Sequence, residues 1–481
     1  MDDKLIFEKS KKGRKAYTLP KWNGEKNFNN SEKYFRSGKI GLPEESEQEV
    51  VRHYVNMSTK NHHVDKGFYP LGSCTMKYNP KINEKIAGME GFTEIHPYQD
   101  ESSIQGVLEL YHELDSMLSE VSGLSKVSLQ PVAGAHGEWT SLKVIRAYHE
   151  SKGNPRKKVI IPDTAHGTNP ASIIMAGYEV VQLPSTAEGL VDIDELREHF
   201  DEDTAAFMIT NPNTLGLFEK NVKEIAEIVH SKGGLLYMDG ANFNALLGIV
   251  KPADMGFDIM HFNLHKTFST PHGGGGPGSG PIGVVDKLIP FLPVPDVVKE
   301  NGKYKLNYNL PQTIGKVHSF YGNYLVLVRA YVYMKILGSD GLHRVSENAI
   351  INANYVKKML DGYYDLPYKQ HCMHEVVFSG ENLMQYGIKT LDVAKRLLDF
   401  NMHAPTIYFP LLVHEAIMIE PTETEGKEVL DEFISVMKQI AQEAKQDPEK
   451  LKMAPETTIV RRLNESLAAK NLNLRYEEET D

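Results

Sequence analysis

The sequence contains very little cysteine. Only Cys74 and Cys372 occur among its 481 residues, so at most one disulfide bond can form. A secreted scaffold held together by several disulfides is therefore excluded. No C-x-x-C pair is present, which also excludes the thiol motif typical of small metal and redox sites. We expect a protein of a reducing compartment, the cytoplasm.

The chain also lacks a membrane-spanning segment and an excess of basic residues. Its most apolar stretch, residues 324–337, is interrupted by Arg329 and Lys335 and is shorter than the roughly 20 residues that a bilayer requires. The N-terminus has no apolar core of signal-peptide length. Lys and Arg number 53 against 64 Asp and Glu, a formal net charge of −11, whereas nucleic-acid binders usually carry a basic face. We expect neither a membrane nor a nucleic-acid partner.

The length and the distribution of polar residues predict three parts. With 41% hydrophobic and 24% charged residues, the composition is typical of globular proteins. Residues 1–90 are polar and poorly periodic, and we expect them to form an arm that wraps a neighbour. We expect a large domain over residues 91–335 and a smaller α+β domain over residues 336–481.

Short apolar strands alternate with amphipathic helices in the predicted large domain. A helix is expected over residues 221–232, and strands over residues 158–162, 179–183, 205–210 and 234–239. Strands that are apolar on both faces and separated by helices are typical of βαβ crossovers and a mostly parallel sheet. The predicted fold class is therefore α/β.

The segment HFNLHKTFSTPHGGGG, residues 261–276, is the most informative for chemistry. Lys266 follows a predicted strand and precedes four consecutive glycines. Nearby hydroxyl groups and imidazoles, including His265, can hydrogen-bond an anionic group, and glycines let the backbone approach a ligand closely. A desolvated lysine is a nucleophile towards carbonyl groups. Taken alone, the pattern also fits a surface lysine beside a flexible loop.

Asp239 ends a predicted strand in YMDGAN, residues 237–242. In an open α/β sheet, ligands bind at the carboxyl ends of the strands. An aspartate at one strand end and a lysine near the next match pyridoxal-phosphate chemistry, in which the aspartate keeps the pyridine nitrogen protonated. Because Gly240 follows, Asp239 could instead be a simple turn residue.

Three further loops follow predicted strands or begin a helix. The loop with Gly134, Ala135 and His136 leads into a helix and so suits a phosphate group. His166 follows one strand, and its ring could lie on a pyridine face. Asn211 follows the next strand. Each of these positions is equally compatible with an ordinary turn or helix start.

Other catalytic motifs are absent from the sequence. The glycine-rich stretch lacks the G-K-[ST] ending of a P-loop, and no G-x-G-x-x-G opens a helix after a strand. There is no G-x-S-x-G nucleophile motif. His62 and His63 have no partner at metal-ligand spacing, so no metal site is predicted.

Long strings of residues resemble the P-protein family of the glycine cleavage system. They include VDKGFYPLGSCTMKYNPKIN, QPVAGAHGE, AHGTNPAS, MDGAN and NLHKTFSTPHGGGGPG, and lie at residues 64–83, 130–138, 165–172, 238–242, 263–278, 320–331, 372–379 and 402–410. The resemblance implies the aspartate-aminotransferase-like fold, known as fold type I of pyridoxal-phosphate enzymes. This fold has a large, mostly parallel sheet domain, a smaller C-terminal domain and an active site near a subunit interface.

The same resemblance implies a cofactor, pyridoxal 5'-phosphate, and roles for single residues. Lys266 in NLHKT would be the Schiff-base lysine, Asp239 in MDGAN would pair with the pyridine nitrogen, and His166 in AHGTN would stack on the ring. The other implied cofactor-binding positions are Gly134, Ala135, His136, Asn211 and His265. For the substrate carboxylate, the candidates are His374, Glu375, Tyr321 and Asn323, although simple packing also explains each of them.

The implied reaction is the decarboxylation of glycine, with release of CO2 and transfer of the aminomethyl group to the lipoyl arm of H-protein. In the two-subunit form of the family, two α and two β chains form a heterotetramer, and this chain resembles the β type. A P-protein subunit 1 (alpha) is therefore an expected partner. The alternatives are an aminotransferase or amino-acid decarboxylase of similar fold, or an inactive scaffold subunit.

Overall fold

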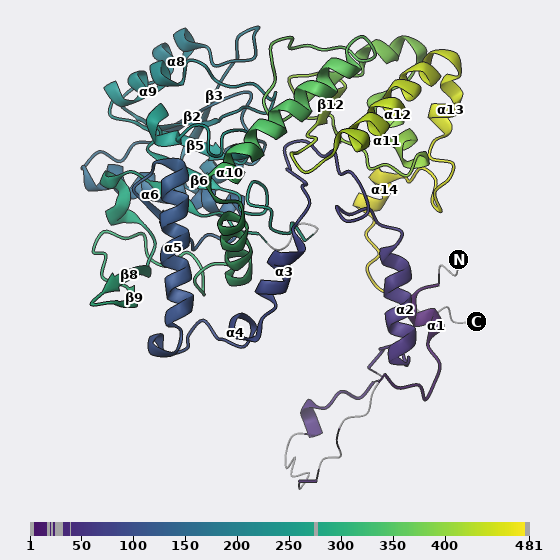
Figure 1. The fold of residues 1–481 in the computed structure, drawn as a ribbon, viewed down its shortest axis with the longest axis horizontal. Coiled ribbons are helices and arrows are strands. Elements are labelled where there is room, and N and C mark those ends of the chain that lie inside the picture. Colours follow the sequence, from purple (N-terminus) through teal and green to yellow (C-terminus); the bar gives the residue numbers. More distant parts are fainter. Residues whose placement is uncertain are drawn as a thin grey trace. The chain divides into compact units, whose positions relative to one another are not determined.

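The computed structural model describes residues 4–16, 20, 23–24, 32–38, 40–273 and 278–476. The chain divides into two compact units (Figure 1). One consists of residues 1–63 and 462–481, and the other of residues 64–461. Within the predicted glycine run, Gly274, Gly275 and Gly276 lie outside the described residues, as does Pro277.

The unit of residues 1–63 and 462–481 is built from short helices. They are α1 (Ile6–Lys9), η1 (Glu32–Tyr34), α2 (Glu47–Ser58) and α14 (Glu465–Lys470). The hydroxyl group of Ser46 accepts a hydrogen bond from the backbone N–H of Glu49, while the Glu49 carboxylate accepts one from the backbone N–H of Ser46. This reciprocal capping fixes the start of α2. Phe7 stacks on Tyr476 with 4.8 Å between the ring centroids.

A seven-stranded sheet forms the centre of the unit of residues 64–461. Its spatial order is β1-β7-β6-β5-β4-β2-β3, and only β7 runs antiparallel to its neighbours. The prediction of a mostly parallel sheet is confirmed. The strands are β1 (Lys126–Ser128), β2 (Lys158–Pro162), β3 (Glu179–Leu183), β4 (Thr204–Thr210), β5 (Leu235–Gly240), β6 (Ile259–Phe262) and β7 (Ile282–Val284).

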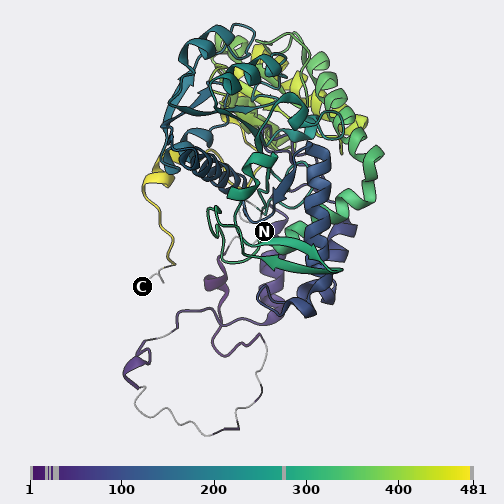
Figure 2. The ribbon, with the colours of Figure 1, turned by 90° about the vertical axis from the view of Figure 1, so that its left-hand side faces the viewer.

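Helices cover both faces of this sheet because its strands are apolar on both sides. Along β5, Leu236 and Met238 face a core shared with α5, α8, α9 and α10, whereas Leu235 and Tyr237 face a core shared with α6 and α7. Figures 1 and 2 show α5 and α10 side by side. The helices are α5 (Gln105–Ser122), α6 (Gly134–Ser151), α7 (Asn169–Met175), α8 (Ile193–His199), α9 (Val222–Ser231) and α10 (Tyr324–Leu360).

Smaller elements complete the surroundings of the large sheet. Strands β8 and β9 pair as an antiparallel hairpin. These elements are α3 (Lys81–Ala87), α4 (Glu90–Thr93), η2 (Glu101–Ser103), η3 (Phe243–Ala245), η4 (Pro252–Met255), η5 (Asp286–Phe291), β8 (Asp296–Glu300) and β9 (Lys303–Asn307).

The C-terminal part of this unit has its own antiparallel sheet, with the order β10-β12-β11. Helices pack against it and enclose a second core around Phe378, Ile417 and Phe433. The elements are β10 (Val376–Ser379), η6 (Glu381–Tyr386), α11 (Thr390–Asp399), β11 (Thr406–Ile407), β12 (Ala416–Ile419), α12 (Lys427–Gln446) and α13 (Pro448–Met453).

Helix α10 connects the two cores. The core of the large sheet extends to Val345, and the second core begins at Ala353. Gly338 interrupts the helix with φ 62° and ψ −173°, a conformation that side chains with a Cβ avoid. The expected boundary at residues 335 and 336 falls just before this glycine, and the expected domain limits remain predictions.

None of the described helices combines the length and the apolar character that crossing a membrane requires.

The central position of β5 leads to a stability prediction. Leu236 is fully buried, so Leu236→Ala should lower the free energy of unfolding by about 2–5 kcal/mol because it leaves a cavity in the core. Equilibrium urea unfolding measures this change. Leu411 is 90% exposed, and Leu411→Ala should change the same free energy by less than ~0.5 kcal/mol. Equal effects of the two substitutions would contradict the assignment of β5 to the core.

Candidate active site

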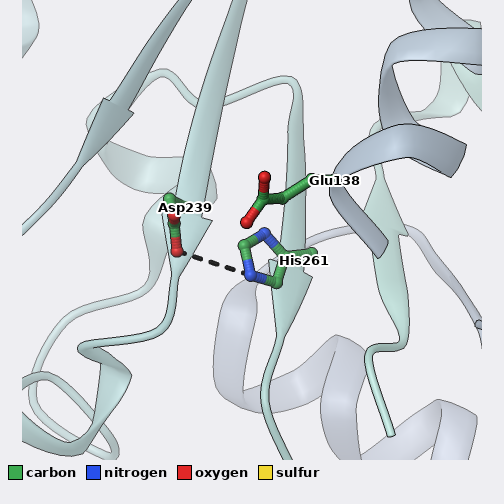
Figure 3. A group of neighbouring side chains, drawn as sticks. All are labelled: Glu138, Asp239 and His261. Carbon is green, nitrogen blue, oxygen red and sulfur yellow. Dashed lines mark ion pairs between the residues drawn. The ribbon is translucent and has the colours of Figure 1, made fainter. Parts of the chain in front are cut away.

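Asp239 lies at the carboxyl end of β5, completely buried. One carboxylate oxygen, Oδ2, accepts a hydrogen bond of 2.9 Å from Asn169 Nδ2. The other, Oδ1, accepts one of 2.9 Å from the backbone N–H of Ala241 and lies 3.4 Å from His261 Nε2 (Figure 3). Both oxygens of the buried Asp239 carboxylate therefore accept a hydrogen bond, and one of them also lies beside an imidazole.

These neighbours determine the charge of Asp239. Burial by itself raises the pKa of this carboxyl group, but the nearby imidazoles of His261 and His166 lower it. The hydrogen bonds from Asn169 and Ala241 lower it further. The net result is a pKa for Asp239 below its ordinary value, so the group is ionised at neutral pH.

Strand pairing explains why His261 lies beside Asp239. The two residues are direct partners in the parallel pair of β5 and β6. Tyr237, two residues before Asp239 and thus on the same face, approaches the other ring nitrogen of His261, with 2.5 Å between its hydroxyl oxygen and Nδ1. The His261 ring is therefore held by β5 at both of its nitrogens.

Glu138 reaches the same group from α6 (Figure 3). It lies on the helix that covers this face of the sheet, and one carboxylate oxygen of Glu138 lies within 4.8 Å of ligand atoms of Asp239 and His261. Its two oxygens accept hydrogen bonds from Thr168 Oγ1 at 2.6 Å and Ser172 Oγ at 2.7 Å. Neither Glu138 nor His261 was predicted as a site residue from the sequence, although Glu138 ends the motif QPVAGAHGE.

His166 is linked to Glu138 through a hydroxyl group. Its Nδ1 lies 2.9 Å from Thr168 Oγ1, which in turn donates to Glu138. Burial, followed by the nearby Lys266 amine, holds the pKa of His166 below its ordinary value. The hydrogen bond with Thr168 sets the orientation of the His166 ring.

Lys266 follows β6 and is only 6% exposed. Its amine, Nζ, donates a hydrogen bond of 2.7 Å to the backbone carbonyl of Ser73. Asn79 Nδ2 donates to the carbonyl of Ser269, and Ser269 Oγ donates to the carbonyl of Tyr78. The segment of residues 73–79 therefore packs directly on residues 263–270, here called the lysine loop. This contact was not predicted from the sequence, although LGSCTMK lies in one of the quoted motifs.

The loop before α6 meets the lysine loop closely. A Cβ on Gly134 would lie 2.4 Å from Asn263 Oδ1, and one on Gly280 would lie 2.0 Å from the carbonyl oxygen of Ala133. No described side chain caps the N-terminus of α6. The N–H groups of its first turn, which includes Gly134, Ala135 and His136, are thus available to a ligand.

The remaining predicted positions have contacts of their own. His136 Nδ1 accepts a hydrogen bond of 3.2 Å from the backbone N–H of Val132. Asn211 Oδ1 accepts one of 3.0 Å from the backbone N–H of Glu219.

The His265 ring packs edge-on against His272 and accepts a hydrogen bond from the Ser279 N–H. Burial lowers the pKa of His265 to about 3.

A second set of buried groups surrounds residues 73–75. The N–H of Ser73 donates a hydrogen bond of 2.7 Å to Glu375 Oε2, and Thr75 Oγ1 donates one of 2.5 Å to Glu420 Oε1. Both glutamates are fully buried, as is His374. Glu420 had no signal in the sequence, because only the three-dimensional structure brings it to this segment.

The other two candidates for the substrate carboxylate, Tyr321 and Asn323, bond to groups of the chain itself. Tyr321 shares a hydrogen bond with Tyr308, with 3.0 Å between the hydroxyl oxygens, and Asn323 Nδ2 donates to the carbonyls of Val132 and Gly278. Cys74 and Cys372 are free thiols.

The architecture first defines a class. The mostly parallel seven-stranded sheet and the separate C-terminal sheet belong to the fold known as fold type I. A crystal structure titled glycine decarboxylase (P-protein) of the glycine cleavage system, in inhibitor-bound form, superposes with a TM-score of 0.72 at 19% identity, covering 86% of this chain and 94% of that one. A NifS-like protein superposes with a TM-score of 0.61 at 16% identity, covering 78% and 100%.

Sequence comparisons then identify the family. The model of the glycine cleavage system P-protein matches residues 25–298, and that of the glycine dehydrogenase C-terminal domain matches residues 345–462. Probable glycine dehydrogenase (decarboxylating) subunit 2 of Chloroherpeton thalassium is 57% identical over 99% of this chain and 98% of its own length. Its namesake in Bacillus licheniformis is 57% identical over 99% of each chain. The chain belongs to the P-protein family of the glycine cleavage system, among its subunit 2 chains.

The link from Glu138 to His166 predicts a loss of stability when Thr168 is changed. Thr168→Val keeps the shape but removes the hydroxyl group, leaving a buried carboxylate oxygen without its donor. We expect the free energy of unfolding to fall by about 1–3 kcal/mol, as measured by urea denaturation. Thr93 is an exposed threonine whose hydroxyl donates to the carbonyl of Met89, and Thr93→Val should have almost no effect. A stable Thr168→Val variant would mean that the hydroxyl link is dispensable.

Proposed function

We propose that this chain decarboxylates glycine with pyridoxal 5'-phosphate, releasing CO2 and passing the aminomethyl group to the lipoyl arm of H-protein. Membership in the family supports the reaction. The observation that carries the proposal is a buried ionised carboxylate, Asp239, at the end of β5 and a buried amine, Lys266, just after the adjacent strand β6 of a fold-type I sheet. A scaffold subunit has no need of this pair.

The side chains around Lys266 and Asp239 fit the proposed cofactor. Several of their buried polar atoms have no hydrogen-bond partner among the described residues: Asn169 Oδ1, Thr210 Oγ1, Asn211 Nδ2, Asn263 Oδ1 and Thr267 Oγ1. Each such atom costs about 1–3 kcal/mol when left unpaired, so a polar ligand at this edge of the sheet would stabilise them. The uncapped first turn of α6, at Gly134, Ala135 and His136, suits the phosphate group.

In this proposal each side chain has a distinct task. When bound, pyridoxal phosphate supplies an electron sink for the electron pair that departing CO2 leaves behind. Lys266 would hold its aldehyde carbon, and Asp239 would accept a hydrogen bond from the protonated pyridine nitrogen. His166, whose ring is oriented by Thr168, would pack on the cofactor ring. Asn211 and His265 are further cofactor-binding positions.

The environment of Asp239 suits its task. A proton stays on a pyridine nitrogen only if the neighbouring carboxylate keeps its charge, and His261 and Asn169 lower the pKa of Asp239 in spite of burial. Because Tyr237 and the strand pairing hold His261 in place, this charge is fixed before any ligand arrives. Such preorganisation is a main source of electrostatic catalysis.

We also propose two protein partners. The relatives are named subunit 2, which supports a subunit 1 (alpha) as partner. We propose that the two assemble as an α2β2 heterotetramer and act with a lipoylated H-protein as carrier. Exposed apolar residues such as Leu42, Leu472 and Leu474 support burial of the unit of residues 1–63 and 462–481 against a neighbour. The free thiols support the cytoplasm as compartment.

The proposed attachment point is tested by removing its amine. Lys266→Ala should abolish the visible absorbance of lysine-bound cofactor and its trapping by borohydride, as judged by peptide mapping of cofactor-loaded protein. Lys357 is another largely buried lysine, whose amine donates to backbone carbonyls, and Lys357→Ala should retain both signals. If trapping persists in Lys266→Ala, another lysine holds the cofactor.

The role of Asp239 is tested with an isosteric neutral residue. Asp239→Asn should keep the cofactor but slow glycine-dependent exchange of CO2 by at least ~100-fold, because the ring nitrogen loses its charged partner. Asp258, a buried aspartate just before β6 that pairs with His230 and Lys287, provides the matched control. Asp258→Asn should leave exchange per folded molecule within a few fold. Equal exchange in Asp239→Asn and wild-type protein would refute the role.

The need for a carrier separates the proposal from its alternatives. An aminotransferase requires a 2-oxo acid, and a simple decarboxylase requires no lipoyl group. We expect CO2 release from glycine by the assembled enzyme to depend on lipoylated H-protein. Release that is indifferent to the lipoyl group would favour the simple decarboxylase.

A further inference from the structure

Two buried carboxyl groups and an imidazole lie together at one end of the paired strands β10 and β12 of the C-terminal sheet. Glu375 directly precedes β10, and Glu420 directly follows β12. These strands pair antiparallel, with Val376 opposite Ile419, so the register brings Glu375 next to Glu420. Together with His374 they offer ligand atoms that all lie within 4.8 Å of one another.

Four of the six side-chain polar atoms of this group have no hydrogen-bond partner among the described residues. Glu375 Oε2 and Glu420 Oε1 accept the hydrogen bonds from Ser73 and Thr75. Glu375 Oε1, Glu420 Oε2 and both ring nitrogens of His374 have no hydrogen-bond partner in the described part of the chain. All three side chains are fully buried, and His374 Nε2 lies 3.9 Å from Glu375 Oε1. Unpaired buried atoms that converge in this way indicate a site for a proton or a small cationic group.

The group lies beside the amine of Lys266. Ser73 accepts the hydrogen bond of Lys266 Nζ at its carbonyl and donates its N–H to Glu375, so one residue separates the amine from the carboxyl group. The other charged groups that act on Glu420 are Glu423 and Lys77, which pair with each other at 2.7 Å. The Cys74 thiol also faces both glutamates, and burial raises its pKa. Because Lys77 is paired with Glu423, Lys266 is the neighbouring basic group that has no ion pair among the described residues.

Burial favours the neutral forms of all three groups. It raises the pKa of Glu420 to about 7, with Thr75 and the Lys266 amine opposing the rise. Burial, reinforced by Glu420, raises the pKa of Glu375 well above its ordinary value. Burial also lowers the pKa of His374 to about 3. Two adjacent carboxyl groups of this kind share protons near neutral pH, because both cannot be ionised without strong repulsion.

We propose that Glu375 and Glu420 form the acid–base pair of this site, which takes a proton from the substrate ammonium group and returns one to the amine of Lys266. This inference rests on the proposed function for the identity of the substrate. An ammonium group has no lone pair, so glycine must lose a proton before its nitrogen can attack, and the displaced lysine must gain one. In the first transfer an N–H bond breaks as a carboxyl O–H bond forms, and the second transfer reverses this change. Neutral His374 completes the polar lining.

Infrared spectroscopy of the full chain without cofactor tests the pair independently of activity. The C=O absorption of protonated carboxyl groups should be present below about pH 7 and fall as Glu420 ionises. Glu420→Gln should remove this component and also move the titration of Glu375 to lower pH, because the repulsion between them is lost. Glu425, whose pKa burial likewise raises to about 7, is the matched control. Glu425→Gln should remove its own component without moving that of Glu375.

Two infrared or analytical results would overturn the proposal. One is a titration of Glu375 that does not respond to Glu420→Gln. The other is a stoichiometric divalent metal ion in the purified chain that Glu420→Gln removes, since the same three side chains could serve as metal ligands. Metal analysis of wild-type and Glu420→Gln protein distinguishes these cases.

Kinetics of the assembled, cofactor-loaded enzyme provide a second test. In Glu375→Gln and Glu420→Gln, kcat for glycine-dependent CO2 exchange should fall by at least ~100-fold, and its pH dependence near neutrality should flatten. KM for glycine and hydride trapping at Lys266 should be retained, whereas Glu425→Gln should match the wild type. An unchanged kcat and pH profile would overturn the acid–base role. Loss of trapping in the wild type would instead defeat the proposed function.

Discussion

The site depends on keeping a negative charge inside an apolar sheet. Asp239 lies between two hydrophobic layers, where burial alone favours the protonated acid. Its charge survives because an imidazole on the adjacent strand and an amide from α7 face its two oxygens. The register of β5 and β6 places Asp239 directly opposite His261, so no further element is needed to bring them together. The rest of the site is arranged around this fixed charge.

The alternation of side chains along β5 explains how a structural sheet also carries chemistry. Leu236 and Met238 pack into one core, while Tyr237 and Asp239 point to the face covered by α6. On that face the apolar packing gives way, towards the carboxyl ends of the strands, to Glu138, Asp239 and His261 (Figure 3). A polar group of this kind is stable only because its members satisfy one another and the hydroxyl groups of α7 and its preceding loop.

The surroundings of Lys266 come from three distant parts of the chain. The segment of residues 73–79 packs on the lysine loop, and the edges of the C-terminal sheet supply Glu375 and Glu420. The amine therefore lies where the large sheet and the C-terminal sheet meet within one unit. The small antiparallel sheet thereby places two buried carboxyl groups close to a lysine that follows a strand of the large sheet.

Some of these features are determined by the amino-acid sequence alone. Runs of apolar residues separated by amphipathic helices determined the α/β class and the mostly parallel sheet, because strand burial on both faces is a local pattern. Lys266 and Asp239 stood out because each follows such a run. Glu138, His261, Ser73 and Glu420 acquired their places only from tertiary structure, because their contacts join residues that are tens to hundreds of positions apart. Strand alternation predicts that Tyr237 and Asp239 share a face, but which helix covers that face, and which loop reaches the lysine, depends on how the whole chain packs.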